Sequence, residues 1–303
     1  MSQALTFAPL PSRALIAVVG PDWRDFLQGL ITQDVETLQP GEARFGALLT
    51  PQGRLLHDLF VVGRDEGCWL DVLAEHRAAI LQRLAMYRLR AKVELSADET
   101  AVSVLFPSAH HREGGDPGGL AGSAESAWVP ASAGMSGFVE DPRLPALGWR
   151  GYGASRPAGA DLADEADREA QKLALGVPGP ADWGSDKTYP IEANFDLLNG
   201  IDFKKGCFVG QETTSRMKRR GQIKSRVAPL AVEGGAIGAG SEILAGDLRA
   251  GQVLTSIPSR ALALLRIDRA TGQQMTIGDR PARLDVPPWL SRAFAMEANR
   301  QEA

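Results

Sequence analysis

The chain has 303 residues, more than a single hydrophobic core usually supports, so two or three domains are expected. Hydrophobic residues make up 44% and charged residues 23%, which is ordinary for a globular protein with a sizeable core. The formal net charge of -4 argues against a general nucleic-acid binder, and no apolar run reaches the roughly 18 residues of a membrane-spanning helix.

The first part of the chain alternates short strands with two helices. Apolar, β-branched and alternating stretches predict strands over residues 13–19, 45–50, 55–62, 68–73, 93–95 and 101–106. The sequence Gly20-Pro21-Asp22 predicts the start of one helix, whose apolar residues recur as far as Leu30, and residues 75–90 have the strongest helical pattern in the chain. The turn Pro51-Gln52-Gly53 makes residues 45–62 a predicted hairpin.

The middle of the chain contains a predicted loop, and the end consists of short predicted strands. Residues 108–126 are rich in Gly, Ser, His and Asp without periodicity and predict a surface loop. Short strands over 128–138 and 145–152, a helix over 161–175 and a helical turn over 195–198 follow. Beyond Gly221, strands separated by Gly and Pro predict a small β-barrel or sandwich; they cover residues 227–232, 242–244, 251–256, 261–267 and 274–277.

Two cysteines, Cys68 and Cys207, limit both compartment and chemistry. They are too few for a disulfide framework, and the opening MSQALTFAPLPSR lacks the regions of a signal peptide, which together predict a cytoplasmic protein. A conventional iron–sulfur cluster needs about four thiolates, or two with histidines. A monomer is therefore not expected to hold such a cluster. His110 and His111 have no partners at ligand spacing, so no metal site is predicted.

The stretch from Lys204 to Glu212 concentrates reactive groups in one loop. Cys207 lies between two glycines, with Lys205 two residues before it and an amide, a carboxylate and an arginine soon after. Nearby cations favour a thiolate, and glycines allow close approach of the backbone to a ligand. The alternative is a glycine-rich turn ahead of a strand, with Cys207 as a small buried hydrophobe.

A basic run follows this loop and includes Arg216, Lys218, Arg219, Arg220, Lys224 and Arg226. It is open to three interpretations: a solvated hairpin edge, an anion site whose guanidinium groups grip carboxylates, or an RNA surface. The absence of interleaved aromatic residues removes the stacking platform expected for single strands.

The string KGCFVGQE at residues 205–212, with Arg216 and Gly221 behind it, closely resembles the signature of the YgfZ family of folate-binding proteins. This family is related to the glycine-cleavage T-protein, an aminomethyltransferase, and is linked to iron–sulfur cluster assembly and repair. Further similar segments run from about residue 10 to residue 270, and include 20–35, 87–93, 141–150, 192–194 and 200–203.

The resemblance implies an α+β fold, a T-protein-like three-domain cloverleaf around a central hole in which tetrahydrofolate sits. Residues 1–220 are expected to form a folate-binding region of two interwoven α+β subdomains, and residues 221–303 a C-terminal β-barrel domain. Cys207 and Lys205 are the implied catalytic residues. The implied folate-binding residues are Glu192, Asp58, Lys205, Cys207, Gln211, Glu212 and Arg216, with Glu192 meeting the donor edge of the pterin because a carboxylate satisfies two donors at once.

Three functions are compatible with this resemblance. The first is a tetrahydrofolate-binding accessory protein that meets iron–sulfur assembly proteins or client enzymes and helps form or repair 4Fe–4S clusters, with Lys205 holding Cys207 as thiolate. The second is a folate-dependent aminomethyltransferase, and the third a folate-binding module without catalysis. The T-protein pattern has two adjacent aspartates where this chain has His57 and Asp58, which speaks against aminomethyl transfer. Arg13 and Arg168 stand where some members of the family have aromatic residues near the folate.

Overall fold

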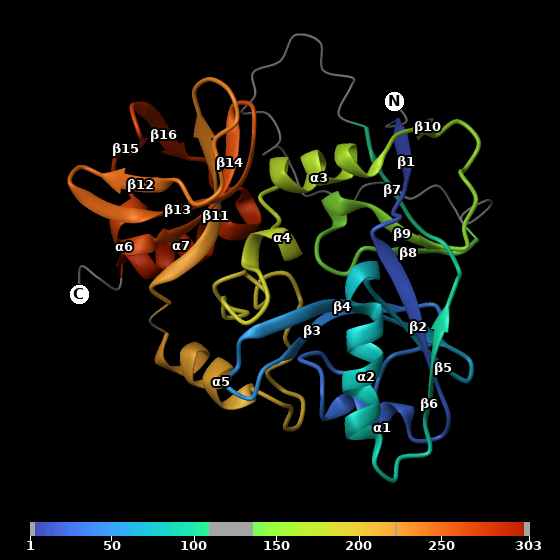
Figure 1. Cartoon of the computed structure of the whole chain (residues 1–303). Coiled ribbons are helices and arrows are strands. Elements are labelled where there is room, and N and C mark those ends of the chain that lie inside the picture. Colours follow the sequence, from blue (N-terminus) through green and yellow to red (C-terminus); the bar gives the residue numbers. More distant parts are fainter. Residues whose placement is uncertain (1–3, 109–135, 222, 300–303) are drawn as a thin grey trace. The chain divides into compact units, whose positions relative to one another are not determined.

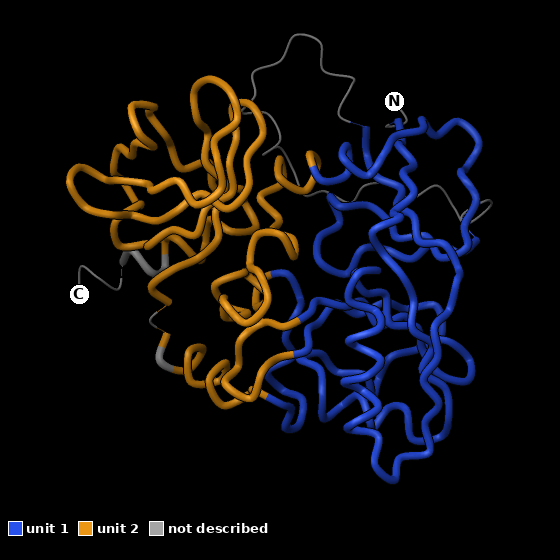
Figure 2. The backbone as a smooth tube through the Cα atoms, viewed as in Figure 1, with its two compact units in different colours: residues 1–48, 57–169, 198–209 blue, residues 49–56, 170–197, 210–303 orange. Residues whose placement is uncertain are grey.

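The computed structural model describes residues 4–108, 136–221 and 223–299. Most of the predicted loop over 108–126 and of the predicted strand over 128–138 lies outside these residues, as do His110 and His111. Two compact units make up the chain (Figure 2): unit 1 contains residues 1–48, 57–169 and 198–209, and unit 2 contains residues 49–56, 170–197 and 210–303.

The first sheet of unit 1 has five strands in the order β3-β4-β5-β2-β6 (Figure 1). Its strands are β2 (Arg13–Val19), β3 (Ala43–Leu49), β4 (Leu55–Arg64), β5 (Gly67–Leu73) and β6 (Glu94–Asp98). Apolar residues of α1 (Trp23–Gln28) and α2 (Arg77–Arg88) join those of the strands in one core cluster. Cys68 is 1% exposed within this cluster, and burial raises the pKa of its thiol. Every element predicted here from residue 13 to residue 95 is confirmed.

The second sheet of unit 1 has the order β10-β1-β7-β9-β8. It contains β1 (Leu5–Pro9), β7 (Val102–Pro107), β8 (Phe138–Glu140), β9 (Trp149–Tyr152) and β10 (Asp161–Leu162). A cluster that includes Leu15 and Val62 of the first sheet and Val104 and Tyr152 of the second forms a core shared by the two. Both sheets of unit 1 therefore pack as one body.

Unit 2 contains a closed six-stranded barrel with the order β11-β14-β13-β12-β15-β16. Its strands are β11 (Ser225–Val232), β12 (Glu242–Ala245), β13 (Leu248–Ile257), β14 (Arg260–Arg266), β15 (Met275–Ile277) and β16 (Arg280–Leu284). The helices α6 (Ile267–Ala270) and α7 (Pro288–Asn299) contribute the buried residues Ile267, Leu290 and Phe294 to the barrel core. The predicted β-barrel is confirmed, with β16 and α7 as additions.

The connecting helices are α3 (Glu165–Ala174), α4 (Pro180–Trp183) and α5 (Gln211–Arg220). The structure forms α5 where the sequence predicted a loop and a possible hairpin edge. This helix has no apolar stripe, so periodicity could not reveal it, but glycines with left-handed backbone at positions 210 and 221 bracket it. None of the described helices has the length and apolar character needed to cross a bilayer.

Candidate functional site

The Cys207 thiol is exposed and unpaired by disulfide. The residues after it fix its position, because Phe208 is 7% exposed and the backbone N–H of Val209 donates to the carbonyl of Gly29 at 3.1 Å. Val209 also packs against the core of unit 1. A reagent or partner can therefore reach the sulfur while the loop that carries it is anchored, which excludes the alternative of a buried structural cysteine.

The ammonium group of Lys205 points to backbone rather than to the thiol. Its Nζ donates to the carbonyls of Ile31 at 2.8 Å and Gln33 at 2.7 Å, and it lies 5.4 Å from the centre of the Phe208 ring. Burial lowers the pKa of Lys205 to about 8, an effect that nearby carboxylates, Asp34 first among them, only partly offset. Among the described residues no hydrogen bond joins Lys205 to Cys207, so its role in holding a thiolate stays a prediction.

The amino-terminal segment at residues 32–34 holds the loop that carries Cys207. The Thr32 hydroxyl donates to the Gly200 carbonyl at 2.6 Å, and the Asp202 N–H donates to the Thr32 carbonyl at 3.0 Å. The side-chain amide of Gln33 donates to the Asn199 carbonyl at 2.5 Å. Two sequence segments that the family resemblance marked separately, 32–35 and 200–207, thus form one hydrogen-bonded site in unit 1.

The remaining residues of the predicted loop signature lie in unit 2, on α5. Gln211 is half-buried, while Glu212 and Arg216 are exposed. Gly210 caps the helix at φ 82°, and a Cβ there would lie 2.6 Å from the Thr50 carbonyl oxygen. Only glycine lets the start of α5 pack this closely on the turn at residues 50–53.

The basic run divides into two groups. Arg216, Lys218 and Arg219 are exposed on α5, and Lys218 lies 3.6 Å from Asp196. Arg226 is only 2% exposed and makes a bidentate ion pair with Asp196, with both N–O distances at 2.9 Å. Arg226 is therefore structural, and any anion site of this segment rests on the exposed side chains of α5 and on Lys224, which is also exposed.

Glu192 is a half-buried carboxylate of unit 2. Its Oε2 accepts a hydrogen bond from the Tyr189 N–H at 3.0 Å, and no described residue donates to Oε1. Burial raises the pKa of Glu192, against the lowering effects of that hydrogen bond and of Arg54. One oxygen thus remains to accept a ligand's N–H.

Asp58, the other predicted folate carboxylate, lies in unit 1 and is 4% exposed. Arg13 Nη1 lies 3.3 Å from Asp58 Oδ2 and 3.4 Å from Oδ1. The neighbouring His57 ring packs 4.9 Å from that of His76, and burial lowers the pKa of His57 to about 4, with His76 contributing in the same direction. Asp58 is thus an ion-paired carboxylate next to a neutral imidazole.

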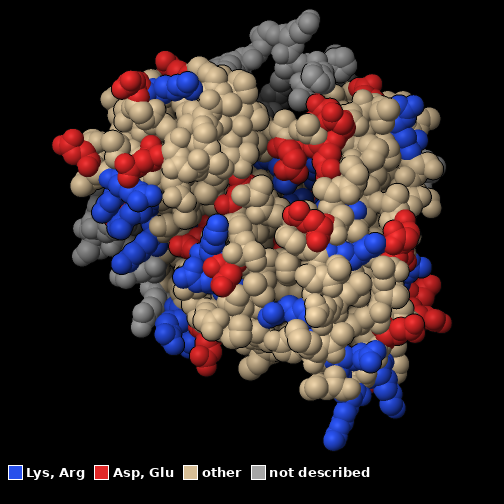
Figure 3. Space-filling view, viewed as in Figure 1, with Lys and Arg blue, Asp and Glu red and all other residues tan. Residues whose placement is uncertain are grey.

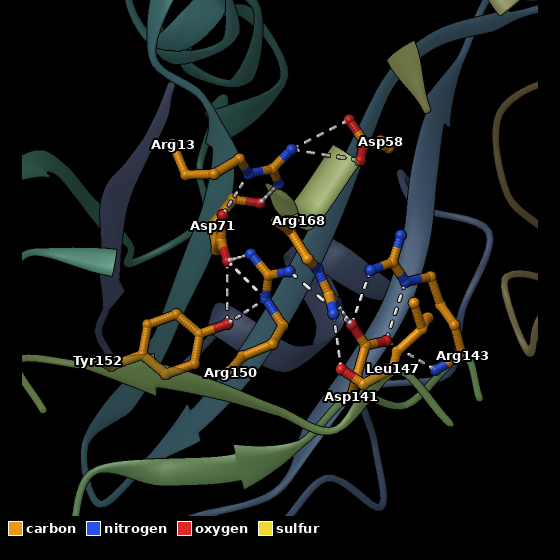
Figure 4. Close-up of polar contacts among 9 residues, drawn as sticks. All are labelled: Arg13, Asp58, Asp71, Asp141, Arg143, Leu147, Arg150, Tyr152 and Arg168. Atoms are coloured by element: carbon orange, nitrogen blue, oxygen red, sulfur yellow. Dashed lines mark hydrogen bonds and ion pairs between the residues drawn. The ribbon is translucent and has the colours of Figure 1, made fainter. Parts of the chain in front are cut away.

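The Arg13–Asp58 pair belongs to a buried polar network that joins both sheets of unit 1 (Figure 4). Asp71 Oδ1 accepts from Arg13 Nε at 2.7 Å, while Oδ2 accepts from Arg150 Nε and the Tyr152 hydroxyl, each at 3.0 Å. The Arg150 guanidinium also stacks 3.8 Å from the centre of the Phe60 ring. This network holds Arg13 in place and thereby determines the partner of Asp58.

A second centre of the same network is Asp141, which is 3% exposed. It accepts from Arg143 Nε at 2.9 Å and from Arg168 Nη2 at 3.1 Å. Burial alone would raise the pKa of Asp141, but the three arginines around it, with Arg143 the strongest, hold it well below its usual range. Burial lowers the pKa of Arg168 to about 9 in spite of Asp141.

Several members of this network lie in the segments that resemble the family, but their contacts with one another were not predicted from the sequence. The available signal was an ionisable residue within an apolar strand, as at Asp71 in the run Trp69-Leu70-Asp71-Val72-Leu73. That signal identifies a buried charge without naming its partners, which are far away in the sequence.

Comparison with known proteins finds a family and several curated proteins that are similar to this chain. Residues 224–292 match the family described as the C-terminal β-barrel domain of CAF17. The iron–sulfur cluster assembly factor IBA57 homolog, mitochondrial, of Neurospora crassa is 34% identical over 238 residues, which are 73% of this chain and 52% of that protein. The human iron–sulfur cluster assembly factor IBA57, mitochondrial, is 31% identical over 240 residues, which cover 73% of this chain and 65% of that protein.

Among solved structures, the glycine cleavage system aminomethyltransferase T from Bartonella henselae matches with a TM-score of 0.72 and 18% identity, over 95% of this chain and 87% of that one. The chain spans about half to two thirds of the length of the curated relatives it matches. The sequence resemblance was to the YgfZ family, and these matches name IBA57 instead. Over about three quarters of its length the chain is therefore similar to the IBA57 iron–sulfur cluster assembly factors, and it has the fold of the glycine-cleavage T-protein with a C-terminal β-barrel that matches the CAF17 barrel domain.

Proposed function

We propose that this chain is an iron–sulfur cluster assembly factor of the IBA57 type that binds tetrahydrofolate and acts through the thiol of Cys207. The observation that carries the proposal is the exposure of Cys207 on a loop held by Thr32, Gln33 and Gly29. The sequence similarity to proteins named as iron–sulfur cluster assembly factors supports the same function.

The chemistry available to the chain is that of a helper. Its other cysteine, Cys68, is sealed in the core of unit 1 with a raised pKa, so one thiol per chain can be reached from solution. Because a cluster needs about four thiolates, Cys207 can supply one ligand or one nucleophile to a cluster that a partner or client largely holds. The chain would then assist assembly without storing a cluster itself.

The folate half of the proposal rests on Glu192 in unit 2. A reduced pterin presents adjacent N–H donors that a carboxylate can accept together, and Oε1 of Glu192 has no donor among the described residues. Glu192 fits that role, with Gln211, Glu212 and the guanidinium of Arg216 on α5 as further candidates. Bound tetrahydrofolate would supply a reduced, one-carbon-carrying pterin, while the chain's own residues bind and orient it.

The T-protein fold favours a second candidate, a folate-dependent aminomethyltransferase. That chemistry needs a free carboxylate near the folate nitrogen that accepts the one-carbon unit. Here Asp58 is buried and paired with Arg13, which Asp71 in turn fixes, and His57 replaces the neighbouring acid. These contacts weigh against the transferase and for the accessory role.

Two measurements test the proposal. Isothermal titration of the purified protein with tetrahydrofolate should give saturable heat, and the absence of both heat and thermal shift at saturating ligand would remove the folate half. In cells that lack the chain, the activity of iron–sulfur enzymes should fall and recover with the wild-type protein. Unchanged enzyme activity without the chain would remove the assembly half.

A further inference from the structure

A basic and apolar projection lies at the end of α2. We call residues 86–92, the end of α2 and most of the connection to β6, the hook. Figure 1 shows this connection at the lower edge of unit 1, and Figure 3 shows Lys and Arg side chains gathered at and projecting from that edge. Leu89 is 88% exposed, Met86 64% and Tyr87 37%, which makes the hook the richest concentration of large exposed apolar side chains among the described residues.

The hook is held in a defined conformation. The Ala91 N–H donates to the Arg88 carbonyl at 2.7 Å, and the Lys92 N–H donates to the carboxylate of Asp22 at 2.7 Å. At its base Gly20 lies so close to the Lys92 carbonyl that a Cβ there would be 2.3 Å from the oxygen. A frayed helix end would show none of these contacts.

Leu89 has a strained backbone conformation in the turn that follows α2. It has φ 43° and ψ -104° directly after the last residue of α2. Positive φ is an outlier for a bulky residue, where glycine or asparagine would normally stand. The chain therefore accepts backbone strain at the one residue whose apolar side chain projects furthest into solvent, a combination that points to a role outside the folded chain.

The charge of the hook identifies the chemistry of a partner. Arg88, Arg90 and Lys92 are all exposed, and no acidic residue occurs between His76 and Glu94, although the whole chain has a net charge of -4. An exposed apolar side chain at Leu89 with cations close to it in the chain fits an apolar socket rimmed by carboxylates. A membrane surface would need no fixed geometry at one leucine, so the rigid presentation favours a protein.

We propose that the hook is a docking element, in which Leu89 enters an apolar socket on an acidic partner protein while Arg88, Arg90 and Lys92 pair with the carboxylates around it. The identity of that partner as a protein of the iron–sulfur assembly machinery rests on the proposed function. Charge pairing at the rim speeds encounter and specifies the partner, and the leucine supplies the buried contact.

The test uses Leu89→Gly, which removes the anchor and relieves the strained backbone, and the double variant Arg88→Glu/Arg90→Glu. Matched controls in the barrel are Leu248→Gly, at a leucine that is 58% exposed, and Arg283→Glu. In cells that lack the chain, the two hook changes should lower iron–sulfur enzyme activity at least about fivefold relative to wild type, and the controls less than about twofold. The purified Leu89→Gly protein should melt at or above the wild-type temperature, because glycine adopts positive φ without strain.

A photo-crosslinking amino acid in place of Leu89, compared with the same substitution at Leu248, separates the possible occupants. We expect an adduct with a partner protein, attached at an acidic peptide of that partner. The double variant Arg88→Glu/Arg90→Glu should abolish this adduct. Full complementation by both hook variants, adducts with lipid, or no more adduct at position 89 than at position 248 would overturn it. If cells without the chain keep full enzyme activity, the proposed function fails, and the crosslinking comparison alone decides the hook.

Discussion

Replacing Asp71 by asparagine tests the buried network that fixes Arg13 and Asp58. Asp71 is 0% exposed and accepts hydrogen bonds from Arg13, Arg150 and Tyr152. After the change, the nearest carboxylate of Arg13 is Asp58 at 3.3 Å, and that of Arg150 is Asp141 at 3.9 Å. Removing one partner of a buried ion pair costs about 3–5 kcal/mol because it leaves an uncompensated charge.

Calorimetry or thermal melting followed by near-UV circular dichroism measures this loss. At about 2–4 °C per kcal/mol for a domain of this size, Asp71→Asn should lower the melting temperature of unit 1 by roughly 6–20 °C. The control is Asp268→Asn, which removes an ion pair with Arg266 at the surface and should cost no more than about 1 kcal/mol.

Two outcomes bear directly on the reasoning. Arg150→Met in the Asp71→Asn background should recover part of the loss, because it removes one of the unpaired cations. If Asp71→Asn melts within about 3 °C of wild type, the network contributes little to the stability of unit 1. The network then does not fix Arg13 as the ion-pair partner of Asp58.

Three further predictions follow from individual side chains. Glu192→Gln should weaken tetrahydrofolate about tenfold or more in isothermal titration, since a hydrogen bond to a charged group contributes about 1.5–3 kcal/mol; unchanged affinity would exclude Glu192 from the site. His57 has a pKa of about 4 in the folded chain and about 6.5 when unfolded, so the unfolded state binds more protons between these values. The free energy of unfolding of the wild type should therefore fall as pH drops from 6.5 to 4, and His57→Gln should make the accompanying fall in melting temperature smaller; equal falls in the two proteins would contradict this prediction. Lys205 has a pKa of about 8 when folded and about 10.4 when unfolded, so its charge lowers stability below pH 8. Lys205→Met also removes the hydrogen bonds to Ile31 and Gln33, so its melting temperature minus that of wild type should be more positive or less negative at pH 7 than at pH 10; an equal difference at both pH values would count against the buried ammonium.

The sequence predicted most of the regular elements because their apolar patterns are local. The strands from 13–19 to 101–106 and the barrel strands from 227 to 277 alternate or run apolar between Gly and Pro, and the structure has them with ends shifted by a few residues. The helix α5 was not predicted because Met217 is the single apolar residue between Gln211 and Arg220, so its helical state depends on the flanking glycines and on tertiary contacts.

The roles of the candidate site residues stay predictions from the sequence, and their contacts could not be predicted from it. The local sequence left Cys207 open between a reactive thiol and a small buried hydrophobe, and its exposure in the structure excludes the second alternative. The partners of Lys205 are the carbonyls of Ile31 and Gln33, more than 170 positions away in the sequence. Every residue has a backbone carbonyl, so the sequence cannot show which of them accepts a hydrogen bond. The same holds for the pairing of Arg13 with Asp58 and Asp71, which only the register of the strands brings together.

The proposed function depends on the exposed thiol of Cys207, through which the chain would act in iron–sulfur cluster assembly. The most direct measurement is the activity of an iron–sulfur client enzyme in cells that lack the chain and express either wild type or Cys207→Ser at equal levels. Because the side chain is exposed, the variant should fold and melt like wild type, yet leave the client enzyme as inactive as in cells without the chain. Full client activity with Cys207→Ser would contradict the account.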